Sequence, residues 1–501
     1  MKADYIVVQA GGKGTRMQHL TRNKPKALVP INNLPMIFHL FKKYPESKFI
    51  IIGDYKCDVL EKYLAAFAEV DYTVVNANGK KGICAGLKQA IDKVPDGRAF
   101  MLIWSDLILN KDFDISDISI GNYVGLSVGF ECRWRYENGS FSEVPSDKCG
   151  VAGMFIFENK SVLTDVPEEG EFVKWLSGID IKFDTVALDK TKEYGLISEY
   201  NKLQTEKCRP FNRIIQGDNY IIKEGTDEQG RQLAVREKAW YEKTMSLGYK
   251  NLPKIYSITP LKIEKINGKN IYEYSDIPEE RKKNILRDLI ECLKKLHGFG
   301  SIPYDEDSFC DAYLDKTFMR LEKVRDLVPF ANDKIITVNG RKCRNVFFCK
   351  DKLREEFEKL KPDKFVFLHG DCTFSNLMLR NDNEPVLIDP RGYFGKTEFY
   401  GDAAYDWAKL YYSVIGNYDQ FNLKRFELDI NAKDVELKIQ SSGWETLEEY
   451  FFKLLKDEVT KRQIKLIHAI IWLSLTTYAW QDYDSICGAF YNGIYYLEEV
   501  L

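Results

Sequence analysis

The sequence predicts an α/β protein made of two domains, the first with a mainly parallel sheet and the second with a sheet-rich lobe followed by a helical lobe. Up to about residue 205, apolar runs typical of buried strands alternate with helical patterns, as expected for a parallel sheet covered on both faces. After that point, a few strand patterns are followed by a long, mostly helical stretch. The 501 residues also exceed the size of one ordinary core.

Composition and charge are those of a soluble globular protein. Hydrophobic residues make up 45% of the chain and charged residues 29%. The net charge of −3 argues against nucleic acid or an anionic membrane as a partner. The longest apolar stretch, near residues 464–475, contains Lys465 and His468 and is too short to span a bilayer. Because there is no secretory leader pattern and the 11 cysteines have no paired spacing, we expect a reduced, cytoplasmic protein.

In the first domain, the apolar runs at residues 5–10, 49–53 and 100–104 are predicted strands, and residues 57–68 and 85–93 have helical patterns. Ligands of such sheets bind at the carboxyl ends of the strands. The first run is followed by a glycine-rich loop, and the third by Ser105 and Asp106. Both segments are therefore expected at the ligand-binding edge.

The glycine-rich loop has the composition of a phosphate-binding site, although such a loop can also be only a tight turn. It offers backbone N–H groups and a nearby helix N-terminus to an anion. Arg16 adds a fork of donors that suits phosphate oxygens, and Lys26 adds a second cation. The residues expected to contact a nucleotide here are Ala10, Gly11, Gly12, Gly14 and Thr15.

Three segments give this domain a family resemblance: Gly11–Met17, Pro25-Lys26 and Leu28–Ile31. Over residues 3–203 the chain resembles the nucleotidylyltransferases, which join a nucleoside triphosphate to a phosphorylated small molecule. The resemblance implies a Rossmann-like fold in which Arg16 acts on the leaving pyrophosphate and Lys26 steadies the substrate phosphate. It places Asn76, Asn78 and Gly82 beside the base, without identifying the nucleotide as CTP, UTP or GTP.

The same resemblance implies two aspartates that hold Mg²⁺ against the triphosphate. Asp106, after the strand at 100–104, corresponds to the first, with a simple turn residue as the alternative. Asp189, in the segment 188–194, corresponds to the second, and Asp184 is the fallback. For Asp189 the competing interpretation is a helix N-cap.

A second phosphate-handling pattern lies in the other domain, where His369–Asn376 is followed by Asp389. An aspartate can orient a substrate hydroxyl and accept its proton, while an asparagine five residues later and an aspartate after a strand can hold Mg²⁺ on ATP phosphates. Over about residues 208–500 the chain resembles the aminoglycoside phosphotransferase and choline kinase superfamily, which has a protein-kinase-like fold. The resemblance assigns Asp371 as the catalytic base and Asn376 and Asp389 as metal ligands.

A kinase of this type also needs a lysine and a helix glutamate that orients it. Lys223, at the end of a strand pattern, and Glu237, in the next predicted helix, match these roles, with two unrelated surface charges as the alternative. The remaining residues of the motif are expected to brace the catalytic loop, the last two through helix N-termini: His369, Asp402 and Asp406.

The segment after Asp389 departs from the superfamily pattern. It reads Pro-Arg-Gly-Tyr, whereas choline kinases more often carry an aromatic and an acidic residue there. The departure argues against choline as the acceptor. Arg391 within it is either a substrate clamp or a structural ion-pair partner.

We therefore expect a nucleotidylyltransferase domain over residues 1–205 and a phosphotransferase domain over 206–501, with a small lobe at about 206–278 and a helical lobe at about 279–501. The small lobe is predicted to contain an exposed edge strand at 219–224, a helix at 236–247 and strands at 261–266 and 270–274. The helical lobe is predicted to contain strands near 365–390 and a hairpin at 335–349.

Together the two patterns predict a bifunctional enzyme with Mg²⁺ as cofactor. One domain would phosphorylate a small hydroxyl compound, with a sugar favoured, using ATP. The other would couple the product to CTP, UTP or GTP, giving an activated precursor for surface polysaccharide or related glycoconjugates. The alternatives are a choline kinase with CTP:phosphocholine cytidylyltransferase, or one catalytic half with a degenerate regulatory half. A glycosyltransferase would need a DxD pair, which Ser105-Asp106-Leu107 lacks. A homo-oligomer is an open alternative to a monomer.

Overall fold

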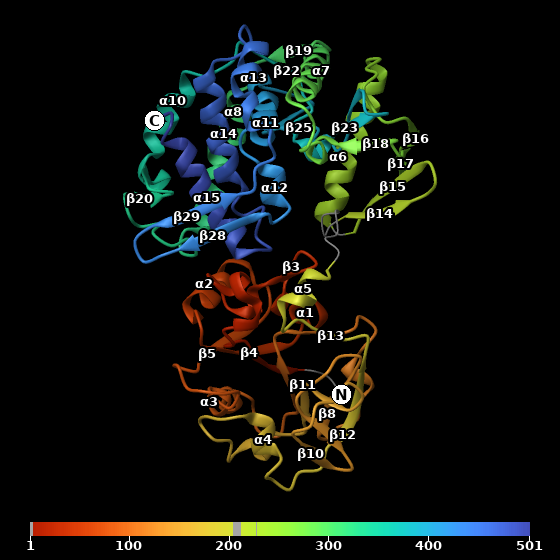
Figure 1. Ribbon diagram of the computed structural model, residues 1–501, viewed down its shortest axis with the longest axis vertical. Coiled ribbons are helices and arrows are strands. Elements are labelled where there is room, and N and C mark those ends of the chain that lie inside the picture. Colours follow the sequence, from red (N-terminus) through yellow and green to blue (C-terminus); the bar gives the residue numbers. More distant parts are fainter. Residues whose placement is uncertain (1–3, 204–211, 227) are drawn as a thin grey trace. The chain divides into compact units, whose positions relative to one another are not determined.

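The computed structural model describes residues 4–203, 212–226 and 228–501 (Figure 1). The chain divides into two compact units, one formed by residues 1–204 with 481–484 and the other by residues 205–480 with 485–501. The boundary segment predicted from the sequence, Gln204–Pro210, lies outside the described residues. Each unit is described separately below.

The first unit is built around a nine-stranded sheet whose central strands are parallel. The strands of this sheet are β1 (Tyr5–Gln9), β4 (Lys48–Gly53), β5 (Tyr72–Asn76), β6 (Phe100–Trp104), β8 (Tyr123–Val128), β9 (Arg135–Glu137), β10 (Ser140–Ser142), β11 (Gly150–Phe157) and β12 (Asp184–Asp189). β6, β1, β4 and β5 are neighbours in this order, β11 runs antiparallel to β6, and β12 pairs in parallel with β8. The predicted α/β class is therefore confirmed, and the three predicted strands are β1, β4 and β6.

Two small pairs of strands and five helices complete this unit. The strand pairs are β2 (Pro30–Ile31) with β3 (Leu34–Pro35), and β7 (Leu107–Ile108) with β13 (Lys192–Glu193). The helices are α1 (Met36–Lys43), α2 (Cys57–Phe67), α3 (Leu87–Asp92), α4 (Phe172–Leu176) and α5 (Ile197–Asn201).

Helices cover both faces of the large sheet, as its apolar strands require. On one face, Val7, Ile50 and Leu102 form a core with residues of α3 and α4. On the other, Phe41 of α1 packs against Phe49 of β4, with ring centroids 4.7 Å apart. The strands are thus held rigidly between two layers of helices, which fixes where each strand ends.

Backbone hydrogen bonds continue beyond the strand ends and align the following loops. Ala10 N–H donates to the Ile52 carbonyl at 2.9 Å, and Ser105 N–H donates to the Gln9 carbonyl at 3.1 Å. Ala77 N–H donates in the same way to the Gly53 carbonyl at 2.8 Å. The loops after β1, β4, β5 and β6 therefore lie side by side at one edge of the sheet.

A buried ion pair within the first unit involves residues that are distant in sequence. Lys24 is 1% exposed, and its Nζ lies 2.9 Å from Asp482 Oδ1 and also contacts the Asp484 carboxylate. A lone buried ammonium would be very costly, so the two carboxylates compensate it. The first unit thus includes four residues that the sequence-based division at 205 assigns to the second domain.

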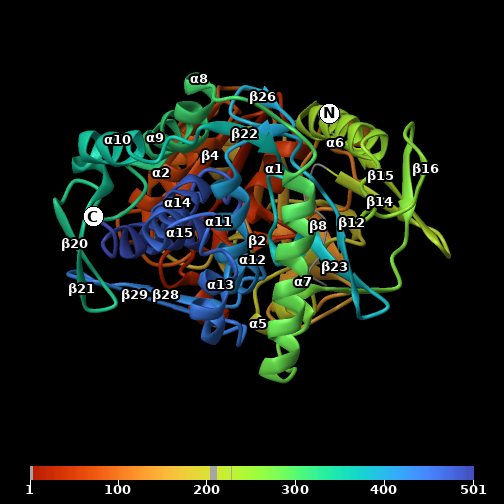
Figure 2. The same ribbon diagram turned by 90° about the horizontal axis from the view of Figure 1, so that it is seen from above.

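The second unit begins with a four-stranded antiparallel sheet in the order β14-β15-β17-β16, against which α6 packs (Figures 1 and 2). These elements are β14 (Asn212–Gln216), β15 (Tyr220–Gly225), α6 (Glu228–Ser246), β16 (Ile255–Ser257) and β17 (Leu261–Glu264). The strand predicted at 219–224 is present as β15, but its predicted position at the sheet edge is wrong, because β15 pairs with β14 on one side and β17 on the other. The predicted strand at 270–274 is also wrong, since residues 271–273 form a 3-10 turn capped by Asn270 and Glu273.

The remainder of this unit is mainly helical, with α11 packed against α14. Its helices are α7 (Glu279–His297), α8 (Glu306–Cys310), α9 (Lys316–Val324), α10 (Lys350–Glu358), α11 (Ala403–Val414), α12 (Tyr418–Asn422), α13 (Glu448–Leu454), α14 (Lys461–Leu475) and α15 (Tyr483–Leu497). Its further strands are β18 (Gly268–Asn270), β19 (Ser301–Pro303), β20 (Ile335–Val338), β21 (Arg341–Arg344), β22 (Lys364–Phe367), β23 (Leu377–Arg380), β24 (Glu384–Leu387), β25 (Tyr393–Phe394), β26 (Thr397–Glu398), β27 (Tyr400–Gly401), β28 (Phe426–Ile430) and β29 (Val435–Ile439). The predicted hairpin at 335–349 is β20 and β21, whereas the hairpin of β28 and β29 was not predicted.

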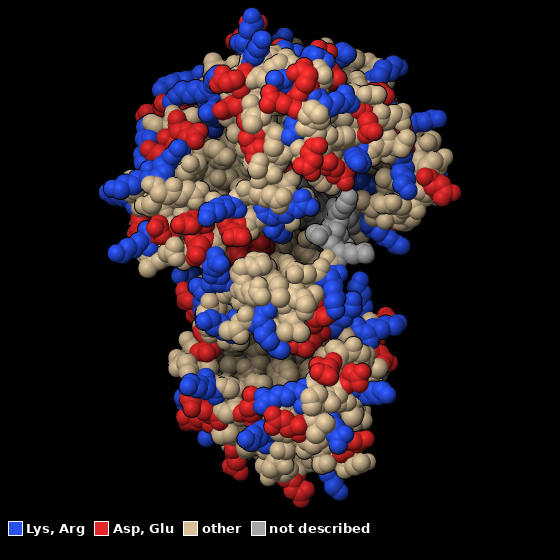
Figure 3. Space-filling model, viewed as in Figure 1, with Lys and Arg blue, Asp and Glu red and all other residues tan. Residues whose placement is uncertain are grey.

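Acidic and basic side chains are interspersed over the face of the molecule shown in Figure 3, and neither sign forms a continuous field there. None of the helices in the described ranges combines the length and apolar character that a membrane span requires.

Gly153 of β11 allows close packing against Trp104, at the end of β6 and beside the ligand-binding edge of the sheet. Its φ is +88°, and a Cβ there would lie 1.9 Å from Trp104 Cε3 at the end of β6. We expect Gly153→Ala to destabilise the protein by about 2–4 kcal/mol through overpacking and backbone strain, measured by urea unfolding followed by tryptophan fluorescence. Gly139→Ala is the control, because Gly139 also has a positive φ but faces open space. Equal losses in both variants would contradict the packing argument.

Candidate functional site

In the first unit, the glycine-rich loop after β1 makes a tight turn that depends on its glycines. Gly14 has φ +63°, and a Cβ there would lie 3.0 Å from Lys26 Cβ. A Cβ at Gly11 would lie 2.8 Å from Asp54 Cβ. The segment Thr15–Thr21 that follows is a 3-10 helix interrupted at Gln18, so the expected helix N-terminus is only a short, irregular turn. Anion binding there would rest on the loop N–H groups and on side-chain cations.

Two cations and two carboxylates meet beside this loop. Lys26 Nζ forms an ion pair with Asp106 Oδ2, and both side chains are largely buried. Glu193 joins them because β13 pairs with β7, which sets Glu193 opposite Leu107 directly after Asp106. Burial raises the pKa of Glu193 and the nearby Asp106 carboxylate raises it further, whereas Lys26 and Arg16 lower it. This arrangement can hold a divalent cation and phosphate oxygens together.

The structure does not bring Asp189 or Asp184 into this group. Both are exposed on β12, where Asp189 lies opposite Val128 of β8. In the described ranges, no recorded contact joins either aspartate to Asp106. Glu193 lies in the same segment, 188–194, in which the sequence analysis proposed Asp189 as a metal ligand. The pairing of β13 with β7, which brings Glu193 close, could not be seen in the sequence.

The residues expected beside the base lie in the loop after β5. Asn76 ends that strand, and its Oδ1 accepts a hydrogen bond from Asn78 N–H at 2.8 Å. Asn78 has φ +54°. A Cβ at Gly82 would lie only 2.3 Å from the Gly170 carbonyl oxygen, so this position tolerates only glycine. The structure therefore places all three expected residues in one constrained loop at the edge of the sheet.

Asp54, at the end of β4, connects this loop with the glycine-rich loop, and the sequence analysis missed it. Its Oδ1 accepts a hydrogen bond from Gly79 N–H at 2.8 Å, and its backbone and Cβ pack against Gly11. The signal that could have identified it is its position, since it follows a buried strand whose neighbours both carry expected site residues.

In the second unit, Lys223 of β15 and Glu237 of α6 form the expected pair. Lys223 Nζ lies 2.8 Å from Glu237 Oε2 and 2.8 Å from Asp389 Oδ1. The side chains of Lys223 and Glu237 are 11% and 6% exposed, so they are not two unrelated surface charges. Burial raises the pKa of Glu237, while the Lys223 ammonium opposes this shift.

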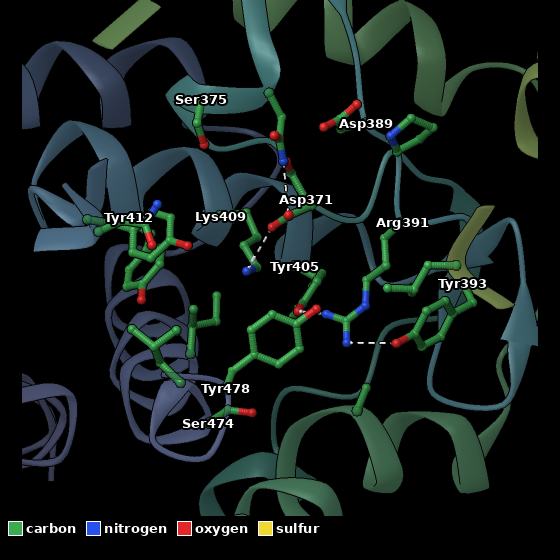
Figure 4. A pocket seen from close by; sticks show the side chains of 18 of the residues that line it. Asp371, Ser375, Asp389, Arg391, Tyr393, Tyr405, Lys409, Tyr412, Ser474 and Tyr478 are labelled. Atoms are coloured by element: carbon green, nitrogen blue, oxygen red, sulfur yellow. Dashed lines mark hydrogen bonds and ion pairs between the residues drawn. The ribbon is translucent and has the colours of Figure 1, made fainter. Parts of the chain in front are cut away.

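Asp371 is held by two side chains that reach its carboxylate from different elements (Figure 4). Asn376 Nδ2 donates to Asp371 Oδ2 and to its carbonyl oxygen, each at 2.9 Å. Lys409 Nζ, from α11, lies 3.0 Å from Asp371 Oδ1. The sequence analysis did not single out Lys409, because nothing in its local sequence distinguishes it from other helix lysines.

Buried side chains hold the backbone of the loop that carries Asp371. Asp406 accepts hydrogen bonds from His369 N–H at 3.0 Å and Gly370 N–H at 2.8 Å, and its Oδ2 lies 3.1 Å from His297 Nε2. His369 Nε2 in turn lies 2.9 Å from the Ile388 carbonyl oxygen. Burial alone would raise the pKa of Asp406, but the contact with His297 lowers it overall. The carboxylate therefore stays charged and fixes the loop.

Asp402 caps the start of α11, as expected. It accepts hydrogen bonds from Ala404 N–H and from the Tyr313 hydroxyl, each at 2.9 Å. Burial raises the pKa of Asp402 to about 6.

A cavity of about 270 Å³ connects these groups. It extends from Lys223 and Glu237 past Asp371 to Arg320 of α9 and Ser474 of α14. Figure 4 shows Asp371 between Asp389 on one side and Ser474 and Tyr478 on the other. The cavity therefore extends to both sides of Asp371.

Both sites have ligands that suit Mg²⁺, although nowhere in the described residues do three His, Cys, Asp or Glu side chains gather into a metal cluster. Mg²⁺ is usually bound through one or two protein carboxylates together with substrate phosphates. Asp106 with Glu193, and Asn376 with Asp389, provide such oxygen ligands. Both donor sets therefore fit a cation that arrives with a nucleotide.

Comparison with protein families gives one match in each unit. Residues 6–113 match the MobA-like NTP transferase domain, and residues 261–434 match the phosphotransferase enzyme family. The chain therefore joins an NTP transferase domain to a domain of the phosphotransferase enzyme family, and both are families of enzymes.

Curated proteins similar to this chain are sugar-phosphate nucleotidylyltransferases. UTP–glucose-1-phosphate uridylyltransferase AglF of Haloferax volcanii is 31% identical over 110 residues, covering 21% of this chain and 44% of that protein. Glucose-1-phosphate cytidylyltransferase of Salmonella typhimurium is 28% identical over 132 residues, covering 21% and 51%. Mannose-1-phosphate guanylyltransferase catalytic subunit beta of Dictyostelium discoideum is 29% identical over 124 residues, covering 24% and 33%. The chain thus spans about half the length of these relatives, or less.

Solved structures similar to this chain include two that cover 40% of it. HddC from Yersinia pseudotuberculosis has 20% identity, 96% coverage of its own chain and a TM-score of 0.34. CTP:phosphocholine cytidylyltransferase LicC from Streptococcus pneumoniae has 17% identity, 97% coverage of its own chain and a TM-score of 0.34.

The Lys223–Glu237 pair gives a direct test of the second site. We expect Glu237→Gln to lower kcat/KM for ATP by about tenfold or more, because Lys223 loses the partner that orients it. Steady-state measurement of ADP release at varied ATP concentration checks this. Glu242→Gln changes an exposed glutamate on the same helix and should leave kcat/KM unchanged. Equal effects of the two substitutions would sink the assignment.

Proposed function

We propose that this protein is a bifunctional enzyme that phosphorylates a small hydroxyl compound with ATP and then couples the product to a second nucleoside triphosphate. The observation that carries the proposal is the gathering, in each unit, of the charged groups that its reaction needs. Arg16, Lys26 and Asp106 lie at the strand edge of the first unit, and Lys223 and Asp371 line the cavity of the second. The product of the kinase reaction is also the kind of substrate that a nucleotidylyltransferase consumes.

In the second unit, Asp371 would accept the proton of the acceptor hydroxyl. The acceptor oxygen then forms a bond to the γ-phosphorus of ATP while the bond to the bridging oxygen breaks and ADP leaves. Lys409 and Asn376 keep the Asp371 carboxylate oriented, and Lys223 is placed to bind the donor phosphates. Mg²⁺, held by Asn376 and Asp389, would neutralise charge on those phosphates.

In the first unit, a phosphate oxygen of the phosphorylated compound would attack the α-phosphorus of the second nucleotide, and pyrophosphate would leave. Lys26 is placed to steady the attacking phosphate, and Arg16 is placed to bind the pyrophosphate. Asp106 and Glu193 would hold Mg²⁺, with Asp189 kept as the alternative second ligand. The loop containing Asn78 and Gly82 would contact the base.

The substrate that we favour is a sugar, so the intermediate would be a sugar phosphate. The curated relatives support this choice, because each is named for a hexose 1-phosphate. Those relatives use different bases, so CTP, UTP and GTP remain candidates here. We further propose a cytoplasmic role in making precursors of surface polysaccharide. A choline kinase with cytidylyltransferase activity is the alternative.

The two activities should separate by mutation. We expect Asp371→Asn to reduce ATP-dependent phosphorylation by about 10²-fold or more, because proton acceptance and hydroxyl positioning are both lost. Nucleotidyl transfer to a pre-made phosphate ester should persist in this variant. Asp106→Asn should do the reverse. ADP release and pyrophosphate release, measured on the same full-length preparations with a panel of sugars, polyols and amino alcohols, check both.

Two outcomes of that experiment would count against the proposal. A near-normal phosphorylation rate in Asp371→Asn would remove the base assignment. If one site binds nucleotide but turns over no acceptor, the alternative of one catalytic half with a regulatory half is favoured instead.

Glu193 and Asp189 can be compared as metal ligands. We expect Glu193→Gln to slow pyrophosphate release by about 10²-fold and to weaken binding of Mn²⁺ as a spectroscopic substitute for Mg²⁺, because a charged oxygen ligand is lost. Asp189→Asn should change neither by more than about twofold, since that carboxylate is exposed on β12. The opposite pattern would return the role to Asp189.

A further inference from the structure

The acceptor end of the kinase cavity contains cations without counter-ions. Arg320 and Arg391 line the cavity, and Lys316, from the start of α9, lies with its Nζ 5.3 Å from the ring centroid of Tyr393. None of the three makes an ion pair with a carboxylate anywhere in the described ranges. All three are partly buried, so water compensates them only in part.

The other cations of this cavity are compensated. Lys223 has two carboxylate partners at 2.8 Å, and Lys409 has Asp371 at 3.0 Å. The contrast shows that the excess of positive charge is local. It begins beyond Asp371, on the side away from Asp389, where Figure 4 shows Arg391, Tyr393 and Tyr478.

The uncompensated cations are fixed in place by neutral groups. Arg391 donates to the hydroxyls of Tyr405 at 2.9 Å and Tyr393 at 3.0 Å. Arg320 Nη1 donates to the carbonyl and hydroxyl oxygens of Ser474 at 2.8 and 2.7 Å. These contacts orient the guanidinium groups without forming an ion pair with a carboxylate.

The pKa values of Lys316, Arg320 and Tyr393 report the same concentration of charge. Burial lowers the pKa of both Lys316 and Arg320, and the nearby Arg391 lowers them further. Burial would lower the pKa of Arg391 as well, but Tyr405, Tyr393 and Asp371 raise it overall. Burial alone would raise the pKa of Tyr393, but Arg391, Lys316 and Arg236 together lower it to about 8. Like charges placed close together destabilise one another. A bound anion would reduce this electrostatic repulsion.

Four of the six tyrosine rings that line the cavity already lie near a cation of the protein. Arg391 Cζ lies 4.7 Å from the Tyr393 ring centroid, and Arg320 Cζ lies 5.6 Å from that of Tyr478. Lys409 Nζ lies 5.9 and 5.5 Å from the ring centroids of Tyr405 and Tyr412. The protein's own cations thus lie beside these four rings, where they would repel a quaternary ammonium.

We infer that Lys316, Arg320 and Arg391 form an anion subsite, and that the acceptor is a hydroxyl compound carrying a carboxylate or a phosphate group. The inference rests on the proposed kinase function and specifies its substrate class. The anionic group would bind the three cations while the hydroxyl to be phosphorylated faces Asp371. Arginine forks suit both carboxylate and phosphate oxygens.

The test compares matched acceptors on the full-length protein. The probes are glucose with glucuronate and glucose 6-phosphate, glycerol with glycerate and glycerol 3-phosphate, and choline. We expect kcat/KM, measured by ADP release, to be at least about tenfold higher for an anionic member of a series than for its neutral parent. The carboxylate and phosphate arms identify which anion is recognised. Higher efficiency with a neutral compound or with choline would overturn the inference.

Variants on α9 test the residues themselves. Arg320→Gln and Lys316→Gln should each raise KM for the anionic acceptor by about tenfold, because a charge-assisted contact is lost, and should leave KM for ATP within about twofold. Lys316→Gln is the variant less prone to unfold the protein, since the Lys316 side chain makes no hydrogen bond within the described residues. Arg325→Gln is the matched control, because Arg325 follows the same helix but pairs with Glu322. Unchanged KM in both pocket variants would refute the assignment.

Failure of the inference can be told apart from failure of the proposed function. Phosphorylation of any acceptor that Asp371→Asn abolishes supports the kinase, whatever its charge preference. If no acceptor is phosphorylated, calorimetry decides, with the protein saturated by Mg²⁺ and a non-hydrolysable ATP analogue. Binding of glucose 6-phosphate or glycerol 3-phosphate that is lost in Arg320→Gln supports the anion subsite, and absence of such binding overturns it.

Discussion

The site of the second unit depends on one buried carboxylate, that of Asp406. It accepts the N–H groups of His369 and Gly370 and contacts His297, so the backbone just before Asp371 is held at two successive residues. Gly370 has φ +82°, which turns the chain so that the Asp371 side chain enters the cavity. A buried anion is costly unless it is fully hydrogen-bonded, and here that requirement becomes the constraint that positions the base.

In the first unit, a sheet and not a buried anion positions the side chains of the site. Parallel strands sandwiched between helices all end at one edge, so side chains that follow different strands meet there without any single organising group. The loop N–H groups, Lys26 and Asp106 are brought together in this way. Glu193 is an exception, since it arrives on β13, outside the main sheet, through two residue pairs with β7.

These differences explain what the sequence could predict. Asp371, Asn376 and Asp389 lie within one short contiguous motif, and the strand at 100–104 is an uninterrupted apolar run, so local pattern was sufficient. Pairing between distant segments produces no local pattern in the sequence. The edge position predicted for the strand at 219–224 was wrong because β14 could not be foreseen as its partner, and the approach of Glu193 to Asp106 was not foreseen for the same reason. Arg320 lies 51 residues before Asp371 in an ordinary amphipathic helix, and only packing reveals its place in the cavity.

An anionic acceptor would also constrain the second reaction. If the acceptor carries a carboxylate, the phosphorylated product has a single phosphate, and that phosphate is the group that would attack the α-phosphorus of the next nucleotide. If the acceptor carries a phosphate ester, the product has two, and the first unit must choose between them. Lys26 alone supplies one cation for the attacking group, which cannot distinguish two phosphates by charge. Discrimination would then have to come from the shape of the edge formed by the glycine-rich loop and the loop around Gly82, whose backbone leaves no room for a side chain. The charge pattern of the kinase cavity thus bears on the selectivity required of the nucleotidyl transfer site.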